Sequence, residues 1–207
     1  MREGESKTDH YEDILGTYLV KLSALKISEN DSSEAAMLLK ALSDFERIGD
    51  HALNILESAE ELKCKNLSLS DAARHELSVL LRAVDEIVDM TFQAFRDGDL
   101  EKAYRVEPLE QVIDDLKEKM RIHHILRMQQ GSCSIESGFV WSDLLTALER
   151  VGDHCSNIAV CMIQIHDNSF DTHSYISDLK ATNNEEFRRK FTVFSEKYML
   201  PDAKKTD

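Results

Sequence analysis

One pattern of chemically active side chains occurs twice in this sequence. The segment ALSDFERIGDHALNIL covers residues 41–56, and the segment LLTALERVGDHCSNIA covers residues 144–159. Both contain the order E-R-φ-G-D-H-x-x-N-I, in which φ is an aliphatic residue. Internal repeats determine the architecture of a chain. A duplicated order of acid, base, glycine and acid therefore indicates a duplicated site as well as a duplicated packing surface.

Two carboxylates in each copy are four residues apart, which places them one turn apart on the same side of a helix. They are Glu46 and Asp50 in the first copy, and Glu149 and Asp153 in the second. Like charges at this spacing repel, and burial adds to the cost because desolvation disfavours an ionised carboxylate. We therefore expect a positive charge to compensate each pair.

A second acidic pair with the same spacing precedes each copy. It consists of Asp9 and Asp13 before the first copy, and of Glu110 and Asp114 before the second. Antiparallel packing of two helices would bring the pairs together as four carboxylates. Oxygen-only clusters suit hard or borderline cations such as Mg²⁺, Ca²⁺, Mn²⁺ or iron. The expected metal ligands are Asp9, Asp13, Glu46, Asp50, Glu110, Asp114, Glu149 and Asp153.

Basic residues inside the motif offer a different explanation of the same acids. Arg47 and Arg150 can neutralise part of the carboxylate charge, and acids spaced E-x-x-x-D are common on helices that bind no metal. His51 and His154 lie about 100° around the helix from the aspartates, so they are adjacent candidates rather than direct ligands. Gly49 and Gly152 weaken a helix interior, which close approach of a neighbouring backbone would justify.

Helical periodicity dominates the chain, and only seven Gly and two Pro interrupt it. Asp31 and Glu34 have the spacing of a capping box, Gly98 suits a left-handed C-cap, and Asp99 can cap the helix that follows. Pro108 is expected to kink or briefly break its helix. The predicted helices cover about residues 9–25, 31–62, 71–97, 99–130, 136–165 and 184–198.

The fold class predicted from this pattern is all-α, with two tandem three-helix bundles built from antiparallel helices. Residues 1–66 form the first repeat, which lacks its first helix, and residues 67–168 form the second repeat. Residues 169–207 form a C-terminal extension with one helix, which we expect to cover a face left open in the first bundle. Bundles of this length can bury a core.

Composition narrows the range of partners. The 207 residues carry a formal net charge of −14, which disfavours binding to nucleic acid and to anionic lipid. The four cysteines include no C-x-x-C, which favours a reduced compartment. No segment approaches the roughly 20 apolar residues of a membrane span. A di-iron enzyme of the four-helix kind is disfavoured, because no histidine has an acid three residues before it.

The paired motifs ERIGDHALNI and ERVGDHCSNIA resemble the signature of the PhoU family, whose members are tandem three-helix bundles. More specifically, VEPLEQVIDDLKEKMRIHHILRMQQGSC and the ending EEFRRKFTVFSEKYMLP look like the C-terminal PhoU-like region of bacterial sodium/phosphate cotransporters. The likeness extends over nearly the whole chain, from Asp9 to Pro201. A complete tandem bundle would have another helix before Asp9.

The resemblance implies a non-enzymatic regulatory or accessory role in phosphate uptake. It implies a cytoplasmic location at the inner face of the cell membrane, with the membrane domain of a phosphate transporter as partner. It also implies a cluster of divalent or iron cations (Fe, Mn, Zn or Mg) on the E(D)-x-x-x-D motifs. A homodimer is compatible with it. The alternative is a metal-free helical scaffold for protein interactions, in which Arg47 and Arg150 pair with the acids.

Overall fold

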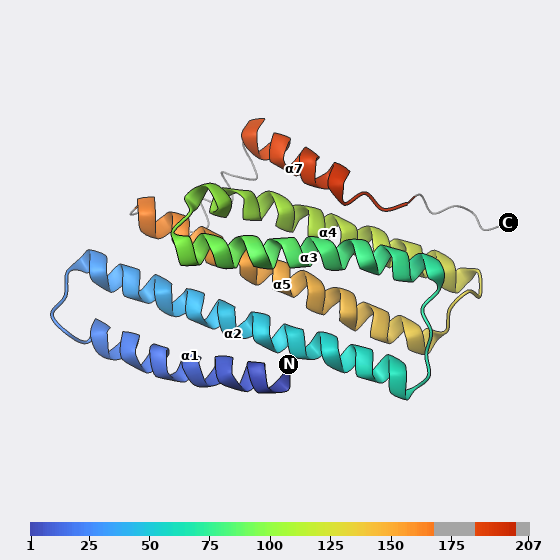
Figure 1. The fold of residues 1–207 in the computed structure, drawn as a ribbon, viewed down its shortest axis with the longest axis horizontal. Coiled ribbons are helices and arrows are strands. Elements are labelled where there is room, and N and C mark those ends of the chain that lie inside the picture. Colours follow the sequence, from blue (N-terminus) through green and yellow to red (C-terminus); the bar gives the residue numbers. More distant parts are fainter. Residues whose placement is uncertain (168–184, 202–207) are drawn as a thin grey trace.

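The structure is a computed structural model, and it describes residues 1–167 and 185–201. All secondary structure within these residues is helical, which confirms the predicted fold class (Figure 1). The helices are α1 (Arg2–Ser23), α2 (Glu29–Cys64), α3 (Asp71–Asp97), α4 (Leu100–Gln129), α5 (Ile135–Asp167) and α7 (Glu185–Lys197).

Local side-chain hydrogen bonds explain where several helices begin and end. Gly98 closes α3 with a φ of 66°, and the Asp99 side chain accepts a hydrogen bond from the backbone N–H of Lys102, as predicted. The predicted cap of α2 is wrong by one turn. Ser28 is the N-cap and forms a capping box with Asp31, because a serine followed three residues later by an acid satisfies two backbone donors.

Pro108 does not break α4. The helix is continuous from Leu100 to Gln129, and Pro108 is buried within it. Proline has no N–H to donate to the carbonyl one turn earlier in the helix, but the nearby Val106 and Leu109 are fully buried. Their burial compensates the lost hydrogen bond, so the expected brief break is wrong, while the alternative, a kink, stays a prediction.

The chain contains two antiparallel hairpins, which meet through α2 and α5. Helix α1 packs against α2, α4 packs against α5, and α2 joins the hairpins by packing along α5 (Figure 1). Helix α3 lies against both α4 and α5, so these three helices form the second bundle. The first hairpin consists of α1 and α2. The predicted boundaries of the repeats, residues 1–66, 67–168 and 169–207, stay a prediction.

A buried ion pair fixes α3 to α4 inside the second bundle. Glu76 is only 3% exposed, and both of its carboxylate oxygens lie 2.9 Å from the Nη1 atom of Arg127. The Nδ1 atom of His123 lies 2.7 Å from the same carboxylate. The Arg127 guanidinium also lies over the ring of Trp141, with 5.7 Å to the ring centroid. The pairing fixes the register of three helices at once.

Helix α7 packs against α4, on the side of the molecule opposite to α1 (Figure 1). Phe194 is buried there, and the Tyr198 hydroxyl and Lys197 both contact Glu86 of α3. The expectation that the last helix covers the first hairpin is therefore wrong. An amphipathic helix can bury its apolar face in any groove of suitable width, so the sequence pattern alone does not select the groove. In the part of the chain that the structure describes, none of the helices is long and apolar enough to cross a membrane.

Candidate functional site

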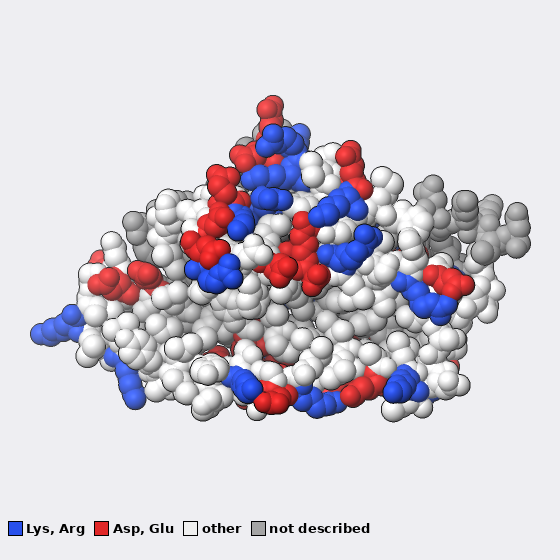
Figure 2. Space-filling view, in the orientation of Figure 1, with Lys and Arg blue, Asp and Glu red and all other residues white. Residues whose placement is uncertain are grey.

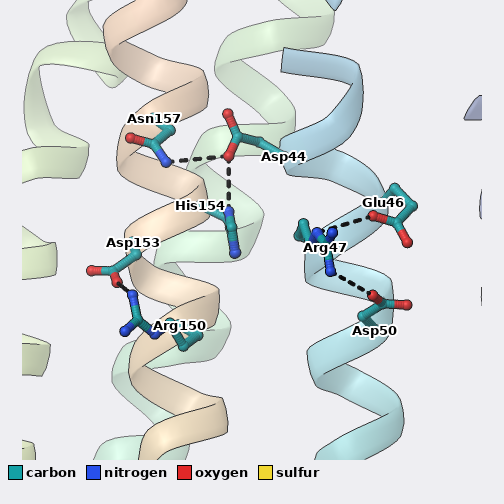
Figure 3. A network of polar contacts seen from close by, with 8 residues as sticks. All are labelled: Asp44, Glu46, Arg47, Asp50, Arg150, Asp153, His154 and Asn157. Carbon is teal, nitrogen blue, oxygen red and sulfur yellow. Dashed lines mark hydrogen bonds and ion pairs between the residues drawn. The ribbon is translucent and has the colours of Figure 1, made fainter. Parts of the chain in front are cut away.

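The acidic pair of the second copy lies at the interface of α4 and α5. The Glu149 side chain is 12% exposed, and its Oε1 atom lies 2.9 Å from the Nζ atom of Lys117. The Asp153 Oδ2 atom accepts a hydrogen bond of 3.0 Å from the Nη1 atom of Arg150 (Figure 3). Two cationic side chains therefore supply the compensating charge that the sequence pattern requires.

The surroundings of Asp153 show that several carboxylates gather here. Burial raises the pKa of Asp153, and the negative charges of Glu149 and Asp114 raise it further, while Arg150 opposes them. Glu110 of α4 is buried at 8% exposure, and its Cγ atom would lie 4.0 Å from a Cβ added at Gly152. The structure thus brings Glu110 and Asp114 to the same interface as Glu149 and Asp153.

The acidic pair of the first copy has the same local arrangement. Arg47 lies 3.6 Å from Glu46 through its Nε atom, and it donates a hydrogen bond of 3.4 Å from Nη1 to Asp50 (Figure 3). Burial raises the pKa of Glu46, and the neighbouring Asp50 and the more distant Glu12 add to the rise. The first pair thus lies beside one carboxylate of α1.

That carboxylate is Glu12, not Asp9 or Asp13. Both aspartates are exposed, whereas Glu12 and Thr8 are partly buried on the side of α1 that faces α2. The expected meeting of Asp9 and Asp13 with Glu46 is therefore wrong by one position. One residue is about 100° around a helix, so this error moves a side chain from the interface to the solvent.

The expectation of a close backbone approach at the two glycines is also wrong. A Cβ added at Gly49 would lie 3.8 Å from Thr8, and one at Gly152 would lie 3.6 Å from Ile113. Both are side-chain contacts at ordinary van der Waals distance. A third glycine outside the motif is different, because a Cβ at Gly138 would lie 2.8 Å from the Nε2 atom of His124.

Carboxylate oxygens are suitable donors for a hard cation, and the Glu149 Oε2 atom is buried without a hydrogen bond from any described residue. The Nε atom of Arg150 lies 3.8 Å from it. Across residues 1–167 and 185–201, however, no group of three or more His, Cys, Asp or Glu side chains is arranged to hold a metal ion. The donors are present, but lysine and arginine occupy the positions where a cation would be needed.

The motif histidines meet at the interface between α2 and α5. The rings of His51 and His154 stack with 5.4 Å between centroids and an angle of 22°. Burial lowers the pKa of His51, and the charge of His154 lowers it further. The two histidines therefore meet at equivalent positions of the two repeats, and their place beside a metal site stays a prediction.

Asp44 completes this interface and was not among the predicted site residues. It is 7% exposed, and its Oδ1 atom lies 2.8 Å from the Nδ1 atom of His154 and 3.2 Å from the Nδ2 atom of Asn157 (Figure 3). A carboxylate only accepts hydrogen bonds, so His154 donates from Nδ1. The equivalent residue in the second copy is Ala147, so a comparison of shared residues could not reveal Asp44.

Comparison with known families agrees with this duplicated geometry. The sequence profile described as "PhoU domain" matches residues 1–59 and 77–162, which include both copies of the motif. The chain belongs to the PhoU family. The two PhoU motifs of this chain lie on α2 and α5, the helices that join the hairpins.

Curated PhoU proteins show similarity over part of their length. The chain is 33% identical over 133 residues to "Phosphate-specific transport system accessory protein PhoU homolog 1" of Thermotoga maritima, which is 62% of this chain and 54% of that protein. It is 29% identical over 131 residues to a PhoU homolog of Deinococcus radiodurans, which is 60% of this chain and 57% of the relative. The chain spans about half the length of these curated relatives.

The fold of the PhoU domain is also found in a solved structure. The crystal structure of PhoU from Pseudomonas aeruginosa superposes with a TM-score of 0.72 at 24% sequence identity. The match covers 81% of this chain and 79% of the other. At this level of identity the comparison establishes the helical fold only.

Proposed function

We propose that this PhoU chain is a non-enzymatic regulatory or accessory domain of phosphate uptake. The observation that carries the proposal is the match of the PhoU profile to both copies of the motif, on the two helices that join the hairpins. The curated relatives are named accessory proteins of phosphate-specific transport systems. A role through contact rather than catalysis agrees with motif residues that are used in helix packing and ion pairs.

We further propose a binding partner for this domain and its location in the cell. The resemblance of residues 106–133 and of the C-terminal segment to sodium/phosphate cotransporters supports a cytoplasmic position at the inner face of the membrane. The partner would be the membrane domain of a phosphate transporter. The net charge of −14 agrees with a protein partner rather than with nucleic acid or an anionic lipid surface.

Phosphate uptake by intact cells tests the regulatory role. Cells that lack the chain should take up radioactive phosphate at a rate different from that of cells in which the chain has been restored. A variant with Asp44 and His154 both changed to Ala loses the hydrogen bond that joins these residues across the α2–α5 interface and should fail to restore the rate. Equal uptake in cells with and without the chain would refute the regulatory role. Cross-linking of the chain to a phosphate transporter in isolated membranes tests the partner.

The carboxylates of α4 and α5 form the stronger candidate for a cation site. A divalent or iron cation, among Fe, Mn, Zn and Mg, would be bound by Glu110, Asp114, Glu149 and Asp153. The raised pKa of Asp153 and the buried Glu149 Oε2 atom support this assignment. Binding would require the cation to displace the ammonium group of Lys117 and the guanidinium group of Arg150. Glu46 and Asp50 would form a weaker second site after displacement of Arg47.

Metal analysis and thermal unfolding test this site directly. Protein dialysed against Mn²⁺ should retain the metal and unfold at a higher temperature, since a ligand that binds only the folded state stabilises it. Replacing both Glu149 and Asp153 by Ala should abolish retention, whereas replacing Asp9 and Asp13, which lie in solvent, should not. Lys117→Met removes the competing cation and should tighten binding. Unchanged metal content after loss of Glu149 and Asp153 would refute the site.

The ion pairs of Arg47, Lys117 and Arg150 favour a second candidate function, a metal-free scaffold for protein interactions. In that case the carboxylates stay paired with these three basic side chains and bind no metal. The prediction is an unfolding temperature that does not change with Mn²⁺, Fe²⁺ or Mg²⁺. Lys117→Met would then lower stability without producing metal binding.

A further inference from the structure

A cavity lies between α4 and α5, at the end of their hairpin where the chain passes from one helix to the other (Figure 1). Its volume is about 500 Å³, within the range of roughly 300–1,000 Å³ that is typical of small-molecule sites. The lining extends along α4 from Lys117 to Met128, a distance of about 16 Å at the rise per residue of an α-helix. The cavity is therefore elongated along the two helices.

Most of the lining is apolar, and part of it is exposed to solvent. Phe139 and Ile135 of α5 are 70% and 71% exposed, and Ile125 of α4 is 43% exposed. Large apolar side chains that are exposed next to one another mark sites of binding. We therefore expect the occupant of this cavity to have an extended apolar part.

The buried part of the lining contains two side chains with unpaired nitrogen atoms. Trp141 is 2% exposed and His124 is 8% exposed. Neither Trp141 Nε1 nor His124 Nε2 has a hydrogen-bond partner among the described residues. Buried polar atoms are nearly always hydrogen-bonded in native proteins, so two such nitrogens in one lining point to a ligand. Burial lowers the pKa of His124, and Arg127 lowers it further, which leaves the imidazole neutral at pH 7.

The charge of the lining has a single sign. Lys117 and Arg121 lie at the end of the cavity that is farther from the connection between the helices, and the lining contains no Asp or Glu. This composition is unusual in a chain with a net charge of −14. Basic and acidic side chains lie next to one another over α7 and α3 (Figure 2), and the cavity beside α7 is lined by both Arg82 and Asp85. One end of the cavity between α4 and α5 therefore favours an anion.

The guanidinium group of Arg121 is accessible to a ligand. Its ion pair is with Glu118 at 3.5 Å, and both side chains are more than half exposed. An exposed ion pair of this kind contributes little to stability, so an anionic ligand can replace Glu118. Lys117 is less accessible, because its Nζ atom lies 2.9 Å from the Glu149 carboxylate. It adds positive charge near the ligand while Arg121 makes the direct contact.

We propose that this cavity binds an anionic amphiphile, a molecule with an unbranched apolar chain and a carboxylate at one end. The carboxylate pairs with Arg121, and the apolar chain lies along the groove between Ile125 and Phe139. Burial of the apolar chain supplies most of the affinity, and the charge fixes the orientation of the ligand. Free phosphate does not fit this description, because it has no apolar part to cover the exposed lining.

The fluorescence of Trp141, which is the only tryptophan of the chain, measures binding directly. Dodecanoate below its micelle concentration should change the emission and reach saturation at one molecule per chain by titration calorimetry. Dodecanoate with a bromine atom on its chain should quench the emission, because bromine quenches only at short range. Dodecylammonium has the same apolar chain and the opposite charge, so it should bind more weakly by about tenfold or more.

Two substitutions locate the site. Arg121→Glu should weaken the binding of dodecanoate by about tenfold or more. Ser142→Phe, at an exposed position of the lining, should abolish binding by filling the cavity. Lys119→Glu is the matched control, because Lys119 is exposed and lies about 200° around α4 from Lys117. It should leave binding unchanged, and all three variants should keep the helical circular dichroism of the unmodified chain.

Several results would overturn the proposal. They are an emission that does not saturate with dodecanoate, equal binding of dodecylammonium, and a loss of affinity in Lys119→Glu as large as that in Arg121→Glu. Full binding by Ser142→Phe would place the ligand outside the cavity and would also overturn it. Binding to vesicles of phosphatidylglycerol without binding of free dodecanoate would identify a membrane contact instead of the proposed site.

Discussion

The interaction of Asp44 with His154 and Asn157 allows a quantitative test of how the repeats are held together. Asp44→Ala removes the acceptor of two hydrogen bonds, 2.8 and 3.2 Å long, at a site that is 7% exposed. Hydrogen bonds to a charged group contribute about 1.5–3 kcal/mol each. Part of this is offset, because the buried Oδ2 atom has no hydrogen bond from any described residue and its desolvation cost disappears with the carboxylate.

The expected net loss is about 3 kcal/mol in the free energy of unfolding. For a chain of this length, each kcal/mol lowers the melting temperature by about 2–4 °C, so a decrease of about 6–12 °C is expected. Urea denaturation followed by circular dichroism measures the free energy, and calorimetry at neutral pH measures the temperature. Ser43→Ala, at an exposed neighbouring position of α2, is the control and should change stability by less than about 0.5 kcal/mol.

A double-mutant cycle shows whether the loss belongs to the interaction with His154. If it does, the two single substitutions should not be additive, and their coupling energy should exceed about 0.5 kcal/mol. A loss below about 0.5 kcal/mol for Asp44→Ala would refute the reasoning. It would mean that the desolvation cost of the buried Asp44 carboxylate is as large as the free energy gained from its hydrogen bonds with His154 and Asn157.

Other parts of the chain support three further predictions. Glu76→Gln should lower stability by about 3–5 kcal/mol in urea denaturation, because it leaves a buried guanidinium without its counter-charge, whereas the exposed Glu118→Gln should cost less than about 1 kcal/mol. Gly152→Ala should raise stability by up to about 1 kcal/mol, while Gly138→Ala should lower it by about 1–3 kcal/mol, since the new methyl group overlaps a histidine ring; thermal unfolding of both variants measures the contrast. The pKa of Asp153 is raised, so the folded state binds a proton at this residue more tightly than the unfolded state does. Asp153 therefore lowers the stability of the fold as pH rises from 3.8, the ordinary pKa of an aspartate, through the raised value. Asp153→Asn should raise the melting temperature at pH 7, and this gain should vanish below pH 3.8.

Features set by neighbouring residues were predictable from the sequence. Gly98 and Asp99 mark a helix boundary because one adopts a left-handed conformation and the other accepts from the first turn of the next helix. The repeat itself predicted that α2 and α5 have equivalent roles. The acids of the motif were expected to need counter-charges, and arginines from the same motif supply them in both copies.

Features that depend on distant contacts were not predictable. Asp44 binds residues more than a hundred positions away, and no local pattern distinguishes it from an exposed acid. The choice between Glu12 and Asp13 depends on the rotation of α1 about its own axis. That rotation follows from packing on α2, which periodicity determines only to about one residue. The countercharge from Lys117 to Glu149 joins two helices and has no signal within the motif.

The weak attachment of α1 has a consequence for how the molecule opens. Because α1 contacts only α2 extensively among the described helices and has no buried residue, it can detach without exposing the central core. Its backbone amides should then exchange with deuterium through a local fluctuation of low free energy, whereas those of α4 should exchange only on global unfolding. A ligand or protease that recognises the form with α1 detached would therefore bind or cleave at the amino-terminal hairpin, while the rest of the fold stays intact.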